Sequence, residues 1–316
     1  MQRVLSTTAL LGLLIATAAA FAITERLKLA KSPIYGTHVS SKFLSPTCGC
    51  ARGKVRVGFS LRHGDHMTLT IRNAAGDVVR TLAQGGYVPR GAVSLTWDGR
   101  TDFGMRVPDG TYRPEVHLTS AHRTILLPNP IRVDTRPPKV ISVNVSRAVI
   151  SPDGDKVGDV IRLHYRFNSP AHVDVYLAGQ RIIHSRSHQP QGTVSWLGKD
   201  ATTRKPLPAG TYVLWVGGTD LAGNATPVAD RQPVILQVRY IRIVRSSIVA
   251  RSAGAPLTVG IDTDAATYWW KLGGRHGVAT GDTLHVLAPK KPGVYRLAVG
   301  ERSYTAHATV IVGKAK

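Results

Sequence analysis

The chain has 316 residues, of which 43% are apolar, 6% are aromatic and 19% are charged, and its formal net charge is +22. This apolar content excludes an intrinsically disordered chain, and the length leaves room for two or three sandwich domains of roughly 80–110 residues. The basic residues are spread along the sequence rather than gathered in an arm, which argues against nucleic acid as a partner. Either this charge attracts acidic wall polymers, anionic lipids or another envelope protein, or it merely keeps the protein soluble.

An uncharged segment runs from Val4 to Ile23 near the N-terminus. As a helix it would measure about 30 Å, which is the thickness of a bilayer core. It also has the form of a signal peptide, with small residues at the candidate cleavage sites Ala18–Ala20 and Ala20–Ala22. We predict that residues 1–31 are a cleaved signal peptide or a retained signal-anchor helix. The protein would then be secreted, or held by this helix on the extracytoplasmic side of the cell membrane.

The charges that flank this segment favour the opposite membrane orientation. Only Arg3 and the amino terminus precede it, whereas Arg26, Lys28 and Lys31 follow it. The positive-inside rule alone would therefore place the C-terminus in the cytoplasm. We give more weight to the downstream sequence, which is typical of extracellular sandwich domains.

Both cysteines of the chain, Cys48 and Cys50, lie in residues 32–53, which we predict to be a linker. Two cysteines are too few for a disulfide scaffold, and too few for a zinc site unless His63 and His66 join them. A disulfide between them, two free thiols and a link to a partner chain are the alternatives. We favour the local disulfide.

Beyond Pro33, apolar and polar residues alternate in many short runs, which is typical of half-buried β-strands. The same order of runs occurs twice. Thr96–Gly99 is matched by Ser195–Gly198, and Pro108–Tyr112 is matched by Pro208–Tyr212, one hundred positions later. A spacing of this size is that of one immunoglobulin-like domain.

A third unit of alternating runs begins near Val238 and ends with Tyr304–Val312. Proline-rich boundaries separate the units, because proline cannot donate to a β-ladder. The predicted fold is therefore all-β, with about three tandem immunoglobulin-like β-sandwiches behind an N-terminal hydrophobic helix. The predicted domains span 54–136, 137–237 and 238–316.

The two repeats resemble the Ig-like domain of the flagellar hook-capping protein family (FlgD-like Ig), which also occurs in exported bacterial proteins. The resemblance rests on Thr96–Arg100, Gly104 and Pro108–Arg113. It covers roughly residues 54–118 and 159–217, with Leu197 in place of the family's aspartate. It implies an immunoglobulin-like fold and says little about function. A role in flagellar assembly is not expected, because the docking segment of the hook-capping protein has no counterpart here.

The second repeat opens with Ser151–Asp159, which resembles an aspartate-rich motif at the start of many exported bacterial β-domains. Its carboxylates at Asp153, Asp155 and Asp159 are candidate ligands for Ca²⁺, which takes six to eight oxygens. Lys156 and the absence of a following glutamate count against this site. The alternative is an Asx-rich turn that leads into the next strand.

Aromatic residues have two expected roles. Trp97 and Trp196 should fill the sandwich cores, and Tyr112, Tyr212 and Tyr295 should return their hydroxyl groups to the backbone at a corner. In Tyr268–Trp270, adjacent side chains of a strand point to opposite faces, so at least one ring should lie outside the core. Trp269 and Trp270 are therefore candidates for stacking on a ligand.

Common catalytic motifs are missing from the sequence, including Gly-x-Ser-x-Gly, His-Glu-x-x-His and a phosphate-binding loop. We therefore expect a non-catalytic extracytoplasmic envelope protein with a structural or adhesive role and no catalytic residues. An anchored accessory subunit that presents a substrate to a separate envelope enzyme is the alternative. A third hypothesis is an enzyme whose site carries no known motif.

Overall fold

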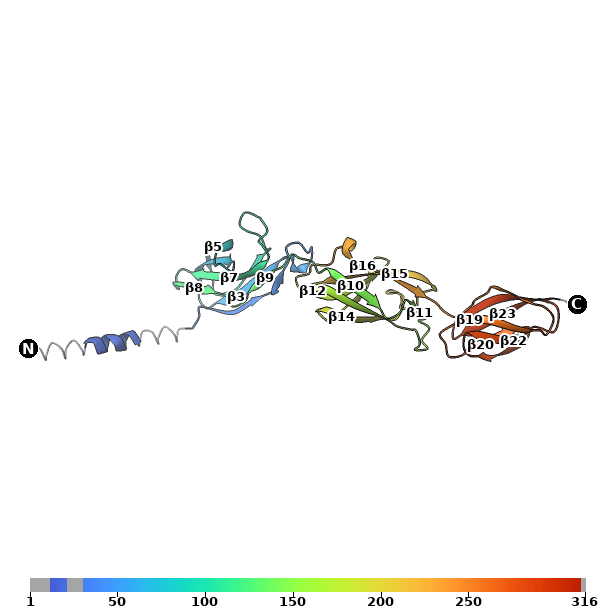
Figure 1. The fold of residues 1–316 in the computed structure, drawn as a ribbon. Helices are drawn as coiled ribbons and strands as arrows, with labels where there is room; N and C mark the ends of the chain where they lie inside the picture. Colours follow the sequence, from blue (N-terminus) through green and yellow to red (C-terminus); the bar gives the residue numbers. More distant parts are fainter. Residues whose placement is uncertain (1–11, 22–30, 314–316) are drawn as a thin grey trace, which may run out of the picture. The chain divides into compact units, whose positions relative to one another are not determined.

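The computed structural model describes residues 12–21 and 31–313 (Figure 1). Residues 12–21 are helical, and the rest of the predicted hydrophobic segment lies outside the described residues. Within the described part of the chain, no helix is both long and apolar enough to cross a bilayer. The chain divides into two compact units, Met1–Thr135 and Arg136–Lys316. The first holds one hydrophobic core and the second holds two, in agreement with tandem immunoglobulin-like β-sandwiches.

In the first sandwich, a three-stranded sheet packs against a six-stranded one. The smaller sheet has the order β1 (Ile34–Val39), β3 (Val55–Leu61) and β6 (Gly91–Trp97). The larger sheet has the order β2 (Phe43–Leu44), β9 (Ile131–Val133), β7 (Gly110–Leu118), β4 (Asp65–Arg72) and β5 (Val78–Val88), with β8 (Arg123–Leu126) beside β7.

Residues 32–53 belong to this sandwich, although the sequence suggested a linker. They contain β1, which pairs with β3, and β2, which runs parallel to β9, and they end in the short helical turn η1 (Ala51–Gly53). A two-residue strand such as β2 is too short to show an alternating pattern, so the sequence gives no sign of it.

The second sandwich is organised around the long strand β12 (Ile161–Leu177). Its first half pairs with β10 (Val140–Val145) and β14 (Gln189–Trp196), and its second half pairs with β13 (Gln180–His184) and β15 (Gly210–Thr219). Two strands complete the sandwich. β16 (Gln232–Val238) pairs with β15 and follows the helical turn η2 (Val228–Asp230). β11 (Val149–Ile150) runs parallel to β16. Alternate residues of β12 are buried on both sides of Pro170, so one strand contributes to both layers.

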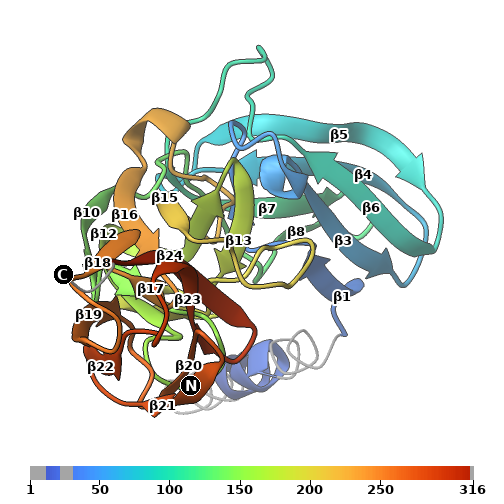
Figure 2. The same cartoon turned by 90° about the vertical axis from the view of Figure 1, so that its right-hand side faces the viewer.

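The third sandwich lies in the same compact unit as the second. Its strands are drawn in orange to red in Figure 2. One sheet has the order β17 (Arg242–Ile243), β19 (Pro256–Asp262) and β22 (Thr283–Leu287). The other has the order β18 (Ser247–Ala250), β24 (Tyr304–Val312), β23 (Gly293–Glu301), β20 (Tyr268–Leu272) and β21 (Arg275–Ala279). Tyr240, in the connection from the second sandwich, packs on the second core and stacks on Tyr304 with 3.6 Å between ring centroids.

The expected core and corner residues are confirmed. Trp97 and Trp196 are buried, and each indole N–H donates to a backbone carbonyl three residues later, at 3.0 and 3.2 Å. The three corner tyrosines each donate a hydroxyl to the carbonyl four residues earlier, at 2.7 to 2.9 Å, and these are Tyr112, Tyr212 and Tyr295. The repeat seen in the sequence is thus a repeat of the same hydrogen bonds.

A buried carboxylate closes one end of the first sandwich. Asp65, at the start of β4, is 5% exposed and accepts the backbone N–H groups of Ser120 and Ala121 at 2.8 and 2.9 Å. Burial by itself would raise the pKa of Asp65, but these backbone donors outweigh it and hold the pKa below its ordinary value of 3.8. The ionised form therefore stabilises the turn after β7.

Replacing Asp65 with asparagine should destabilise the first sandwich by about 1–3 kcal/mol at neutral pH, because hydrogen bonds to a charged acceptor are lost. Because the pKa of Asp65 is lower in the folded state, its contribution to the free energy of unfolding is complete above the ordinary carboxyl pKa. This contribution disappears as the pH falls through the folded pKa. Urea unfolding of the wild type and Asp65→Asn, followed by fluorescence, should therefore differ at pH 7, and the difference should shrink only below the ordinary pKa of 3.8, as the pH falls through the folded pKa of Asp65. A difference that does not shrink there would contradict this account.

Candidate functional site

The aspartate-rich loop 151–159 connects β11 to β12 and folds back on itself. Three of its residues have a left-handed backbone, namely Gly154, Lys156 and Gly158. The carboxylates of Asp153, Asp155 and Asp159 accept four backbone N–H groups of the same loop, at 2.6 to 3.0 Å. The aspartates thus build an Asx-type turn, and each carboxylate still has lone pairs for further contacts.

The third sandwich brings two more acids to this loop. Asp264 follows β19, and Glu301 is the last residue of β23. Carboxylate oxygens of three side chains, one each from Asp153, Asp264 and Glu301, lie within 4.8 Å of one another. The carboxylate oxygens of the three loop aspartates also lie within 4.8 Å of one another. Because Asp153 belongs to both groups, the five residues form one cluster, which we call the junction acids: Asp153, Asp155, Asp159, Asp264 and Glu301.

Glu301 is the most deeply buried of the junction acids, with 5% of its surface exposed. Its Oε2 accepts the hydroxyl of Thr263 at 2.5 Å, whereas its Oε1 is buried without a hydrogen-bond partner. Burial and the adjacent Asp153 carboxylate raise the pKa of Glu301 to about 8. Partial desolvation at the junction, together with the charges of Asp153 and Asp155, also raises the pKa of Asp264, although this residue keeps contact with solvent. The raised pKa values mean that the cluster brings more carboxylates together than can all stay ionised without a compensating proton or cation.

No motif in the sequence marks Asp264 or Glu301. Both follow the loop by more than 100 residues, and only the packing of the third sandwich on the second brings them together with Asp153. The one available signal is compositional, because only 19 residues of this basic chain are acidic.

Cys48 and Cys50 form a disulfide in the loop after β2. This loop is the counterpart, in the first sandwich, of the aspartate-rich loop. Both follow a two-residue strand and begin with Ser-Pro, and the two prolines, Pro46 and Pro152, cover the left-handed glycines Gly99 and Gly198. The two loops occupy equivalent positions, but the first contains a disulfide and the second contains hydrogen-bonded aspartates.

The two candidate stacking residues are placed differently. Trp270 faces the third core and covers Gly277. Trp269 lies on the opposite side of β20, across Gly300, with the Lys271 ammonium 5.7 Å from its ring centroid. Trp269 is therefore the outward ring, although the backbone of β23 covers part of it.

The outer face of the sheet β10–β12–β14 carries a row of basic side chains. Arg162, His164 and Arg166 are exposed at alternate positions of β12. Their neighbours on the two flanking strands are exposed, short and uncharged: Ser142, Asn144, Ser146, Gln191, Thr193 and Ser195. We call these nine residues the basic face. It was not singled out by the sequence, because the three basic residues have the ordinary pattern of a solvated strand face.

The opposite sheet of the second sandwich has an apolar outer surface. Val213, Trp215 and Ile235 are 38%, 41% and 65% exposed, and β15 and β16 place them side by side. Tyr176 on β12 lies opposite Trp215, and the Arg231 guanidinium stacks over its ring at 3.6 Å. Exposed aromatic and branched residues on one sheet face are suited to a protein partner.

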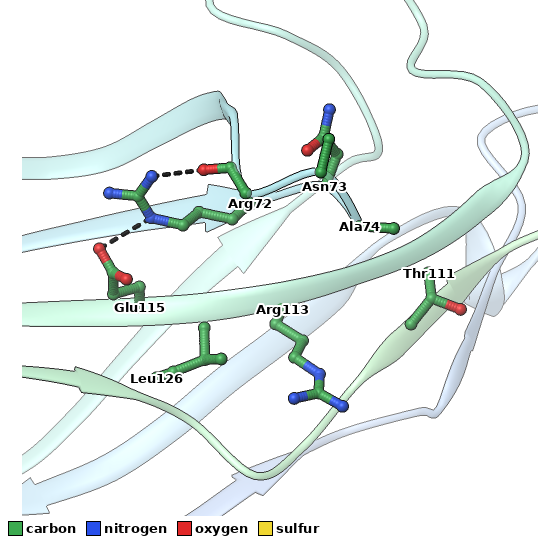
Figure 3. Close-up of a pocket in the computed structure, with 9 residues that line it drawn as sticks. Arg72, Asn73, Ala74, Thr111, Arg113, Glu115 and Leu126 are labelled. Carbon is green, nitrogen blue, oxygen red and sulfur yellow. Dashed lines mark hydrogen bonds and ion pairs between the residues drawn. The ribbon is translucent and has the colours of Figure 1, made fainter.

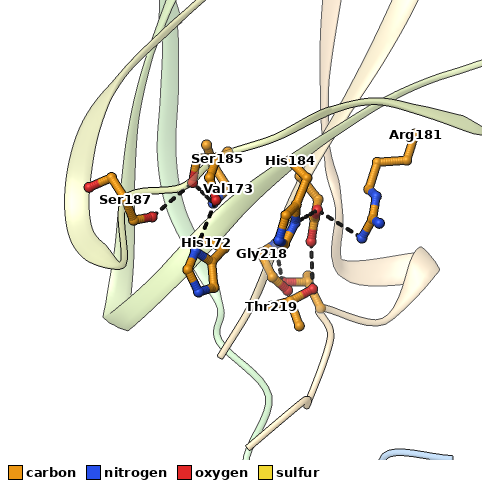
Figure 4. Close-up of polar contacts among 10 residues, drawn as sticks. His172, Val173, Arg181, His184, Ser185, Ser187, Gly218 and Thr219 are labelled. Carbon is orange, nitrogen blue, oxygen red and sulfur yellow. Dashed lines mark hydrogen bonds and ion pairs between the residues drawn. The ribbon is translucent and has the colours of Figure 1, made fainter. Parts of the chain in front are cut away.

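A polar cluster surrounds a buried aspartate in this sheet (Figure 4). The fully buried carboxylate of Asp174 accepts from His184 Nδ1 at 2.7 Å, from Arg181 at 3.3 Å and from the Thr219 hydroxyl at 2.5 Å. An Asp–His pair can belong to a hydrolytic triad. Here the adjacent Ser185 hydroxyl is already bonded to the backbone of Val173 and Ser187, so the cluster ties β12, β13 and β15 together.

In the first sandwich, an open groove of about 530 Å³ lies beside the turn after β4 (Figure 3). Arg72 forms its wall and is paired with Glu115 at 2.8 Å, while Arg113, Thr111 and Leu126 line the rest. One of its two arginines is thus neutralised, and the groove lacks the concentrated charge of the junction acids or the basic face.

Comparison with known proteins supports the fold. Residues 46–122 match the FlgD Ig-like domain, which confirms the predicted resemblance for the first repeat. No curated protein sequence matches the chain.

Solved structures of tandem sandwich domains are similar to this chain. The I9–I11 tandem from titin has 11% identity and a TM-score of 0.34, and the alignment covers 88% of this chain and 100% of titin's fragment. Three N-terminal domains of the bacteriophage RB49 highly immunogenic outer capsid protein have 13% identity and a TM-score of 0.25, covering 89% and 98%. Bacteroides ovatus SGBP-B, from a mixed-linkage glucan utilisation locus, has 14% identity and a TM-score of 0.21, covering 82% and 64%. These values carry no inference about function.

If the Asp174 cluster is structural, Asp174→Ala should destabilise the second sandwich by at least about 2 kcal/mol, because several donors lose a charged, buried acceptor. The matched variant His184→Ala should cost less than about 1 kcal/mol, since His184 is partly exposed and Asp174 keeps its other partners. Urea unfolding followed by tryptophan fluorescence measures both. Equal losses in the two variants would show that His184 holds the cluster together.

Proposed function

We propose that the protein is an exported, non-catalytic envelope protein whose sandwich domains have a structural or adhesive role, and that its second sandwich binds acidic wall polymers. The observation that carries the proposal is the basic face, where three exposed basic side chains follow one strand among uncharged neighbours. The formal charge of +22 adds a long-range attraction for polyanions of the cell envelope.

The geometry of the basic face suits an extended polymer. Alternate residues of a strand lie about 6.7 Å apart, so Arg162 and Arg166 are separated by about 13 Å along β12. A guanidinium can bind a carboxylate or a phosphate through two parallel hydrogen bonds. The surrounding hydroxyl and amide groups, such as Asn144, Gln191 and Thr193, can donate to and accept from sugar hydroxyl groups. The face thus offers charge and neutral hydrogen bonding in parallel rows.

Nucleic acid fits this face less well than a wall polymer does. Proteins that bind single strands combine basic residues with aromatic rings on which the bases stack. None of the nine side chains of the basic face is tyrosine, tryptophan or phenylalanine. The face is also a flat sheet surface without a protruding helix or ribbon for the major groove.

A second candidate function is an anchored accessory subunit of a separate envelope enzyme. The observation that favours it is the apolar surface of Val213, Trp215 and Ile235, on the sheet opposite the basic face. In this role the protein would hold a polymer on one face and dock the enzyme on the other. Co-purification of one defined enzyme, lost in Trp215→Ala and Ile235→Ser, would favour this candidate over a purely structural role.

Replacing Arg162 and Arg166 with alanine should weaken binding to an acidic polysaccharide such as polygalacturonate. Exposed ion pairs contribute about 0.2–1 kcal/mol each, so the loss should be about 2- to 30-fold, and it should shrink as salt rises. The matched control is Arg90→Ala with Arg123→Ala, which removes the same charge from exposed positions of the first sandwich. Equal losses in both double variants would mean that only net charge matters, and stronger binding to DNA than to the polysaccharide would overturn the proposal.

The location of the sandwich domains can be tested separately. When the full chain is expressed in bacteria, protease added outside cells with a permeable outer layer should digest the sandwich domains. Membrane retention after a salt wash would indicate an uncleaved anchor, and release would indicate a cleaved signal peptide. Protection of the domains until the membrane is broken would contradict an extracytoplasmic location and support the orientation that the charges after Ile23 favour.

A further inference from the structure

The junction acids stand out against the charge of the whole protein. Five of the 19 acidic residues of a chain with a net charge of +22 gather where the second sandwich meets the third. The basic groups beside them are Lys156, within the loop, and Arg302, whose guanidinium lies beside Gly154. Both of these side chains are exposed, so they compensate the buried part of the cluster only weakly.

Glu301 gives an independent indication that the cluster is made for a ligand. Glu301 is only 5% exposed, its Oε1 has no N–H or hydroxyl donor, and the adjacent acidic side chain is the carboxylate of Asp153. A buried carboxylate oxygen without a donor is destabilising unless a cation or a proton compensates it. This oxygen belongs to the side chain that reaches toward Asp153 and Asp264, whose carboxylates come within 4.8 Å.

The backbone of the loop is adapted to this approach. Gly158 has a left-handed backbone, and a Cβ atom at this position would collide with Asp264 Oδ2. A residue larger than glycine would therefore keep the carboxylate of the third sandwich away from the loop of the second. Glycine at position 158 therefore allows the Asp264 carboxylate to approach the aspartate-rich loop.

We propose that the carboxylates of Asp153, Asp264 and Glu301 bind one Ca²⁺ ion and that this ion fastens the third sandwich to the second. The donors are all oxygens, which selects a hard cation. Calcium accepts six to eight ligands in irregular geometry, whereas magnesium requires near-ideal octahedral geometry. Three carboxylates from three separate segments, completed by water, fit the calcium requirement better.

The equivalent loop of the first sandwich supports this assignment. There the turn after β2 is cross-linked by the Cys48–Cys50 disulfide. In the second sandwich the corresponding turn carries carboxylates instead, and it faces a neighbouring domain. An ion can cross-link such a loop to its neighbour without a covalent bond.

The ion would act beside the aromatic contact that already joins these two sandwiches. Tyr240 stacks on Tyr304 and donates its hydroxyl to the carbonyl of Leu207 at 2.6 Å. Tyr304 lies three residues after Glu301, in the next strand of the same hairpin. Occupancy of the site would thus hold both sides of one hairpin turn against the second sandwich.

The test is calcium titration of the EDTA-treated full chain, by calorimetry and by thermal unfolding. We expect one site with a Kd of about 10⁻⁴ to 10⁻³ M, in the range of extracellular calcium modules, and a melting temperature that rises with calcium. Magnesium at the same concentrations should have a much smaller effect. Absence of saturable calcium binding would overturn the proposal.

Three variants locate the ion. Glu301→Gln and Asp264→Asn should each weaken calcium binding at least about tenfold, because each removes one charged ligand. The matched control is Asp262→Asn, which lies in the same junction but is paired with Arg239 and Arg242. If Asp155→Asn abolishes binding while Asp264→Asn does not, the ion belongs to the loop alone and the proposed junction site is wrong.

A separate readout follows the joint itself. Arg239 is exposed in the connection between the two sandwiches, and the exposed Arg242 begins β17, so trypsin can cleave there when the joint opens. Calcium should slow this cleavage in the wild type and in Asp262→Asn, but not in Glu301→Gln. If Glu301→Gln is instead more stable than the wild type and the wild type does not respond to calcium, the carboxylates share a proton and bind no ion.

Discussion

The hydrogen bond from the buried tryptophan to the backbone three residues later fixes the geometry on which each of the first two sandwiches depends. It holds Trp97 and Trp196 in the core and sets the turn that follows them. That turn contains a left-handed glycine, and the proline of the Ser-Pro loop packs on it. The position of the Ser-Pro loop, and of everything it carries, therefore follows from the placement of one inward aromatic ring.

This constraint explains why two loops of different chemistry lie in equivalent places. In the first sandwich the loop contains the Cys48–Cys50 disulfide, and in the second it contains Asp153 and its neighbours. The aspartate-rich loop has a neighbouring domain to interact with, because the third sandwich follows it in the same compact unit.

The sequence predicts the parts of this fold that depend on local periodicity. The alternation in Ile161–Phe167, the core tryptophans and the corner tyrosines are all present as expected. Residues 32–53 were missed, because β2 is formed by pairing with distant β9 and not by any local preference. Asp264 and Glu301 were missed for a related reason, since their proximity to Asp153 arises only when two domains pack. The nine residues of the basic face were unremarkable in sequence, because their significance comes from the strands that lie beside β12.

The two kinds of charge are segregated within the second sandwich, and this separation bears on how they can work together. The basic residues Arg162 and Arg166 occupy an outer sheet face, whereas the acids gather at the end of the sandwich that meets the third domain. Repulsion between the acids and a polyanion is screened beyond a Debye length of about 8 Å at physiological salt. A polymer on the basic face and a cation among the junction acids thus need not compete, and a cation would reduce the repulsion that remains. If both proposed sites are occupied, the acids would stiffen the joint while the basic face makes the contact with the polymer.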